Sequence, residues 1–384
     1  MLQDYKKYYY GRTDMTMLND EKVYGSLGIN LKKVTTIVEG VGSLMLPNSL
    51  KAPIERLELI GNSTQGENPA PDNPQEIKSA GRFDEASRKY LLDVKVTGRN
   101  ILSDVGDTYN VFVPCLIKAG TTVTLITNGV ESDGGNILFT TDSGEDYWYA
   151  IDKGVTKVAR SINKNVIGFK NRLQKKDGLK YCLVIGDTDN YEPYTEQTVQ
   201  IALDEPLRGI KRITDGKNVQ EALNSSGITR RFKEVEITKD TPIVCTLGQY
   251  GASEINTVIC RYRDTSLKKT GAILCGELKN INNWAKDEES VFMTEQGIDF
   301  RLSRERLCLG SNTTPEENKV AVIKYLENHP LHCIAELNEP ITEPLPESVQ
   351  QQLQTLHSEN GVTHVFVDSG EIPCGIKVEY VIGG

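Results

Sequence analysis

The chain has few of the residues on which catalysis most often depends. Only 4 of its 384 residues are histidine and only 2 are tryptophan, and every histidine lies after residue 328. The sequence contains no glycine-rich nucleotide loop, no G-x-S-x-G nucleophile elbow and no H-E-x-x-H zinc motif. We therefore expect a protein that is not an enzyme and that carries no cofactor.

Long hydrophobic runs are also missing. No run approaches the roughly 18 apolar residues that a bilayer span needs, and the polar start at residues 1–7 has no apolar signal-peptide region. With 53 acidic against 44 basic residues, the net charge is -9. The basic pairs Lys175-Lys176, Arg230-Arg231 and Lys268-Lys269 are isolated, so we expect them in solvated turns. These features argue against membrane insertion and against a nucleic-acid partner, which needs a continuous basic surface.

The sequence holds no cysteine or histidine spacing typical of a metal site. Its eight cysteines are scattered without a C-x-x-C pair, although Cys245, Cys260 and Cys275 are evenly spaced by 15 residues. We predict that the cysteines are buried free thiols that act as small apolar residues. In residues 329–333, Pro330 separates the two histidines, and a zinc ion would need two further ligands. We therefore predict no metal site.

Short alternating segments dominate what the sequence does contain. Residues 54–60 alternate between apolar and charged residues, as a half-buried strand does. Between residues 100 and 200, seven short strand candidates are separated by turns of Gly, Asn and Asp, which is typical of a β-sandwich or jelly roll. The prolines of residues 66–74 and the segment around Glu205-Pro206 indicate extended connectors.

Two segments near the C-terminus have the pattern of helices. Thr314 to Glu317 forms a capping box with proline at the first helical position. The spacing behind it predicts a buried face made of Val320, Ile323 and Leu326. The second helix carries an apolar stripe of Val349, Leu353 and Leu356. That stripe either packs in a threefold helix cluster or packs on its own domain.

These patterns predict a mainly β fold: jelly-roll or β-sandwich-like domains joined by extended connectors, with two short C-terminal helices. The predicted division is 1–50, an N-terminal arm with attachment strands; 51–99, β strands with a Pro-rich connector; 100–200, the β-sandwich; 201–231, a connector; and 232–384, a second β-rich domain with both helices.

Acidic and aromatic residues gather in one segment of the predicted sandwich. They are Asp142, Glu145, Asp146, Tyr147, Trp148 and Tyr149. One interpretation is a glycan-binding site, in which aromatic rings stack on sugar rings and carboxylates bind hydroxyl groups. The other interpretation is a polar turn that leads into a strand whose aromatic residues belong to the core. Trp284, in a polar stretch, is a further candidate contact residue.

Eight short segments between residues 50 and 382 are distinctive. They are APIERLELIGNS (52–63), PAPDNPQEI (69–77), YEPYTEQTV (191–199), EPLRGI (205–210), GITRR (227–231), YLENHP (325–330), ELNEPI (336–341) and EPLPE (343–347). In sequence and in order, these segments resemble minor structural proteins of the tail tip or baseplate of tailed phages and prophages of Firmicutes, proteins of receptor-binding type. Residues 211–226 depart from that family's usual acidic linker, and residues 1–50 have no counterpart in it.

The resemblance implies a structural protein of a phage tail, baseplate or tail-like particle. It implies a homotrimer that contacts other tail or baseplate proteins and host surface polysaccharide, resides in the virion and assembles in the host cytoplasm. It transfers no catalytic residue. The alternative is a tail-associated enzyme that degrades glycans with a carboxylate pair such as Asp142 and Glu145.

Overall fold

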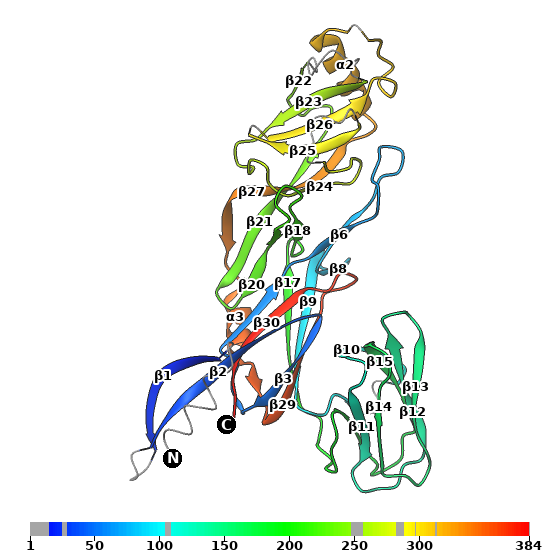
Figure 1. The fold of residues 1–384 in the computed structure, drawn as a ribbon, viewed down its shortest axis with the longest axis vertical. Coiled ribbons are helices and arrows are strands. Elements are labelled where there is room, and N and C mark those ends of the chain that lie inside the picture. The colour runs from blue at the N-terminus through cyan, green and yellow to red at the C-terminus, as the bar shows by residue number, and fades with distance from the viewer. Residues whose placement is uncertain are drawn as a thin grey trace.

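The computed structural model describes residues 15–24, 29–103, 109–246, 256–281, 288–295, 297–311 and 313–383. The molecule is elongated and mainly β, as the sequence predicted, and comprises a central body, a sandwich body beside it and a distal body at one end (Figure 1). The described residues include two short helices, and neither has the length and apolarity that a membrane span requires.

One large sheet forms the central body. Its strands, in spatial order, are β17 (Glu196–Leu203), β9 (Lys89–Thr97), β29 (Gly361–Asp368), β3 (Ser43–Ser49), β2 (Ile29–Val41), β30 (Gly375–Val381), β5 (Arg56–Ile60), β20 (Ala222–Asn224), β21 (Gly227–Ile237), β27 (Leu331–Glu343) and β24 (Ile273–Cys275). The added strands are β1 (Met15–Tyr24) on β2 and β8 (Arg82–Asp84) on β9. Three separate pairs are β4 (Ala52–Pro53) with β28 (His357–Ser358), β6 (Ser63–Gln65) with β7 (Ile77–Ser79), and β18 (Gly209–Lys211) with β19 (Asn218–Gln220).

Two antiparallel strand pairs of this sheet carry the other bodies. β9 and β17 pair along their whole length, and the chain between them, residues 98–195, leaves the sheet to build the sandwich body. β21 and β27 pair in the same way around residues 238–330, which build the distal body except for β24, a strand that pairs with β27 in the central sheet. Each body is therefore joined to the sheet by two paired strands, which restrain it more than a single extended linker would.

The sandwich body consists of two packed sheets. One contains β10 (Phe112–Ile117), β15 (Val166–Leu173), β12 (Gly135–Thr141) and β13 (Asp146–Ile151) in that order, and the other contains β14 (Lys157–Ser161), β11 (Thr122–Thr127) and β16 (Tyr181–Ile185). Alternate residues of each strand fill the space between them, among them Phe139, Tyr149 and Phe169. Phe366 of β29 joins this core, so the sandwich body rests on the central sheet.

The distal body packs a four-stranded sheet with α2 (Pro315–Leu326). The sheet order is β22 (Ile243–Thr246), β23 (Thr257–Arg263), β26 (Gly297–Ser303) and β25 (Ser290–Thr294). The predicted capping box is confirmed, because Thr314 and Glu317 exchange hydrogen bonds. The predicted buried face is partly wrong: Val322 and Leu326 are buried, whereas Val320 is 67% exposed. Helical spacing fits several faces, and packing against the sheet selects one of them.

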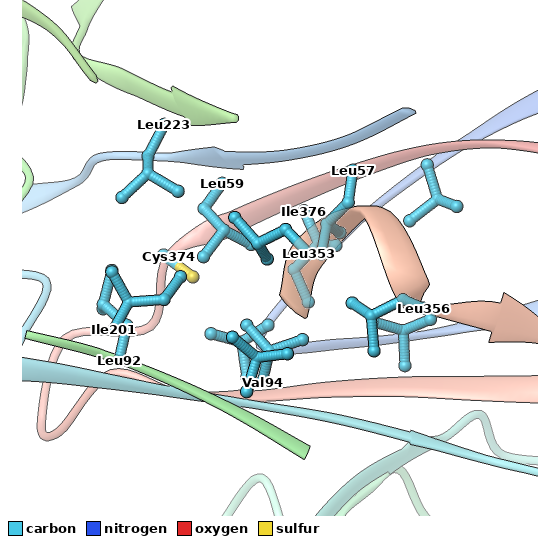
Figure 2. Packing of buried hydrophobic residues seen from close by; sticks show 14 of the residues in the cluster. Leu57, Leu59, Leu92, Val94, Ile201, Leu223, Leu353, Leu356, Cys374 and Ile376 are labelled. Atoms are coloured by element: carbon cyan, nitrogen blue, oxygen red, sulfur yellow. The ribbon is translucent and has the colours of Figure 1, made fainter. Parts of the chain in front are cut away.

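The second helix, α3 (Glu347–Thr355), covers the core of the central body. Figure 2 shows Leu353 and Leu356 among side chains from the central sheet, including Ile376 and Val94. Val349 packs against the same cluster. Of the two arrangements that the sequence left open for this stripe, the structure has the one in which it packs on its own body.

The strand pairing differs from the predicted division in two places. Residues 201–231, predicted to be a connector, contain β18, β19 and β20, and strands of three residues are too short to leave a periodic signal. Residues 232–384 were predicted to form one domain, yet β29 and β30 pair in the central sheet. Residues 66–76 also do more than connect, because Gln75 donates its backbone N–H to Gly276 and Asp72 pairs with Arg306 at 2.8 Å, both in the distal part.

A buried ion-pair cluster lies in the central body at the start of β21, a region we call the neck. The Glu221 carboxylate is fully buried and accepts hydrogen bonds from Arg230 Nη1 at 3.1 Å and from the backbone N–H of Arg208 at 3.0 Å. Arg230 also pairs with Glu343 at 2.9 Å and is 4% exposed. The expectation that Arg230 lies in a solvated turn is therefore wrong, since its charge is neutralised inside the protein.

The cysteine prediction holds for some residues and fails for others. Cys245 and Cys260 are direct cross-strand partners on β22 and β23, and they form a disulfide. Cys308 is free but exposed. The remaining five, Cys115, Cys182, Cys275, Cys333 and Cys374, are buried free thiols. Spacing along the sequence contained no information on which strands would become neighbours.

Candidate functional site

The alternation of strand β13 divides the predicted glycan-binding residues between two sides of the sheet. Tyr149 is 0% exposed and donates its hydroxyl to the Val123 carbonyl at 2.5 Å, so it belongs to the core, and burial raises its pKa to about 12. Tyr147 is half-buried and stacks on Phe139 from the same side. Trp148 points the other way and is 56% exposed. Trp284 lies outside the described residues.

The three acidic candidates lie in or next to the turn between β12 and β13. Glu145 pairs with Lys164, and this hydrogen bond and the lysine charge lower the pKa of Glu145. Asp142 accepts a hydrogen bond from Asn165 at 2.9 Å, and Asp146 begins β13 on the same side as Trp148. A glycosidase acid must hold its proton near neutral pH, which requires a raised pKa. The environment of Glu145 has the opposite effect.

The register of the four-stranded sheet assembles a different set of residues around Trp148. Trp148 is directly opposite Leu138, Leu138 is opposite Lys170, and Lys170 is opposite Phe112. This row crosses all four strands and, at about 4.8 Å per strand, extends about 14 Å. The two aromatic rings stand on the edge strands, with Phe112 43% exposed, while Leu138 within the row is buried. We call this surface the outer face.

A second row on the outer face supplies another cation. Arg172 lies two residues from Lys170 on β15, its guanidinium carbon is 5.3 Å from the centre of the Trp148 ring, and its Nε donates to Asn110 Oδ1 at 2.9 Å. Gly168, on the other side of Lys170, makes room for the Phe112 ring, because a Cβ there would collide with the ring carbons. Phe112, Lys170 and Arg172 were not among the residues predicted from the sequence. Alternation along β13 could have separated Trp148 from Tyr149, but only the register brings four strands together.

A cavity of about 560 Å³ at the junction of the central and distal bodies is the other candidate. Residues 74–77, 234–236, 276–277 and 332–334 line it. His332 stands between two carboxylates, with Nδ1 2.8 Å from Glu277 and Nε2 3.4 Å from Glu236. Glu277 also accepts the backbone N–H of His332, so it holds the edge of β27 in position.

The side chains that line this cavity are not arranged as a catalytic site. Its one nucleophilic side chain, Cys333, lies directly opposite Cys275, and their hydrogen bond together with burial raises the pKa of Cys333 well above its ordinary value. A thiol that keeps its proton is a poor nucleophile and a poor metal ligand. Within the described ranges, no three side chains of histidine, cysteine, aspartate or glutamate are grouped so that they could hold a metal ion.

Comparison of the chain with known proteins adds no assignment. No family model, curated protein or solved structure matches it. Function is therefore inferred from the outer face, the architecture and the resemblance of the eight segments.

Proposed function

We propose that the chain is a structural subunit of a phage tail tip, a baseplate or a phage-tail-like particle, and that its outer face contacts host surface glycans. The observation that carries the glycan contact is the row from Phe112 to Trp148, which keeps two aromatic rings exposed on one face of a four-stranded sheet. Apolar C–H faces of sugar rings pack against such rings, and exposed aromatic groups on a rigid strand lose little entropy on binding.

The elongated architecture supports the structural role. Several segments that carry the resemblance meet at the neck, where the Gly61 backbone lies against Arg208 and where Arg230 pairs with Glu343. What these segments share is thus a set of close structural contacts within the central body rather than a reactive site. A subunit that must hold a binding body at a defined position needs a rigid support of this kind.

The resemblance extends the proposal to assembly and location. The subunit forms a homotrimer, contacts other tail or baseplate proteins, assembles in the host cytoplasm and remains in the virion. Native mass spectrometry of the purified chain tests the first point, and a stable monomer would contradict it. Quantitative proteomics of particles purified from the strain that carries the gene tests whether the subunit remains in the virion. Absence of the subunit from these particles would refute the structural role.

Glycan contact is tested by binding of the purified chain to the cell-wall polysaccharide of that strain. We expect Trp148→Ala to weaken binding at least tenfold, because Trp148 is the exposed aromatic side chain of β13. Tyr149→Phe, which retains the core ring, leaves binding unchanged. Equal binding by wild type and Trp148→Ala would exclude the outer face as the contact surface.

A further inference from the structure

The outer face carries two cations that have no carboxylate partner among the described residues. Lys170 forms no ion pair with any residue that the structure describes, and the contacts of Arg172 are the Trp148 ring and the neutral Asn110 side chain. Three other lysines of the sandwich body are paired with carboxylates: Lys153 with Asp133, Lys157 with Asp187 and Asp189, and Lys164 with Glu145. In a chain of net charge -9, Lys170 and Arg172 are two neighbouring cations that lie beside exposed aromatic rings.

The positions of these cations relate them to the aromatic rings. Lys170 lies within the row between Phe112 and Trp148, and Arg172 lies beside the Trp148 ring. A chain of sugars stacked on both rings would pass directly over Lys170. The acidic residue on this face, Asp146, stands at the end near the turn, where Thr140 donates to it at 3.5 Å. The middle of the outer face is therefore apolar and positive.

We propose that the outer face recognises an anionic glycan, one whose repeating units carry carboxylate or phosphate groups. This inference rests on the proposed glycan contact and specifies its chemical class. Phe112 and Trp148 pack on the sugar rings, while Lys170 and Arg172 donate hydrogen bonds to the anionic groups. Charge-assisted hydrogen bonds of this kind are stronger than neutral ones, and they weaken as salt screens them.

The test compares one polysaccharide in charged and uncharged form. The probe is the wall polysaccharide of the strain that carries the gene, used as isolated, after hydrofluoric acid has removed its phosphodiesters, and after carbodiimide amidation of its carboxylates. We expect the wild-type chain to bind the native polymer about tenfold or more tightly than the form that has lost the recognised group. The two treatments distinguish phosphate from carboxylate.

Variants connect the preference to the named residues. Lys170→Gln combined with Arg172→Gln should bind the native polymer as weakly as wild type binds the neutralised one, and its binding should no longer respond to sodium chloride. Lys180→Gln removes an exposed charge next to the other sheet and should match wild type. Phe112→Ala should lose binding to both forms, whereas Phe83→Ala, which removes an equally exposed ring (43%) from β8, should not.

Each contrary result has a defined meaning. Equal binding of native and neutralised polymer overturns the anionic class and leaves the glycan contact standing. No binding of the native polymer overturns both. If the chain binds poly-glutamate as tightly as the native polymer, the outer face accepts any polyanion, and the glycan class is overturned. If the wild type does not bind the polysaccharide and Trp148→Ala no longer forms oligomers, the outer face contacts a second protein chain. That combination overturns the proposal.

Discussion

Acidification should weaken the contact between the central sheet and the sandwich body through His364. This side chain lies on the same face of β29 as Phe366, which belongs to the sandwich core, and the two rings stack at 6.0 Å. His364 is 2% exposed, and its Nε2 has no hydrogen-bond partner among the described residues. Burial alone lowers its pKa from 6.5 to about 4.

The sign and size of the effect follow from proton linkage. Between pH 6.5 and 4 the unfolded chain binds a proton at this site and the folded chain does not, so stability falls as the pH falls through this window. At about 1.4 kcal/mol per pH unit, the loss reaches about 3 kcal/mol at pH 4. Above pH 6.5 both states are neutral at this site, and its contribution no longer changes.

Urea unfolding at pH 7.5 and pH 4.5 measures this loss. Other groups titrate in the same range. The informative quantity is therefore the loss of unfolding free energy between pH 7.5 and pH 4.5, compared between wild type and His364→Leu. We expect the pH-dependent loss to be about 2–3 kcal/mol smaller in His364→Leu. Phe366→Leu is the matched control, because it weakens the same contact by packing alone and should lower stability equally at both pH values.

Two results would refute this reasoning. One is a wild-type pH dependence that persists in His364→Leu. The other is an NMR titration of the His364 ring in the folded protein with a midpoint near 6.5, which would mean that burial does not suppress its charge.

Two further predictions concern the neck. Glu221→Ala leaves the buried charge of Arg230 short of a partner and should lower the free energy of unfolding by about 3–5 kcal/mol. We expect faster amide hydrogen exchange in β20 and β21 of this variant, whereas Glu145→Ala removes an exposed ion pair and should leave exchange unchanged. Equal exchange rates in both variants would contradict the role of Glu221. Gly61→Ala places a Cβ within 2.7 Å of the Arg208 backbone nitrogen. Overpacking of this kind costs about 1–3 kcal/mol, so the variant should unfold at a lower urea concentration. In Gly310→Ala the new Cβ meets no atom within 4 Å, and the urea midpoint should stay the same. A Gly61→Ala variant with the wild-type midpoint would show that the close approach is not required.

The sequence was sufficient wherever a structural feature is local. Alternation in residues 54–60 and the turn residues of the sandwich predicted strands, and the pattern from Thr314 to Glu317 predicted the start of α2. These signals are reliable because backbone geometry alone determines that strand side chains alternate and that a helix start needs capping. A mainly β fold follows from the same local preferences.

The sequence was insufficient wherever residues far apart in the chain must meet. It could not show that Trp148 shares a row with Phe112, or that Glu221 neutralises Arg230. It placed Tyr149 with Trp148 in one candidate site, although the alternation of β13 directs them to opposite sides. Which side is buried depends on the second sheet that covers it, and which strands pair depends on burial summed over the whole fold. Local sequence thus determined the strands and their alternation, whereas tertiary packing alone decided which residues form the outer face, the neck and the disulfide.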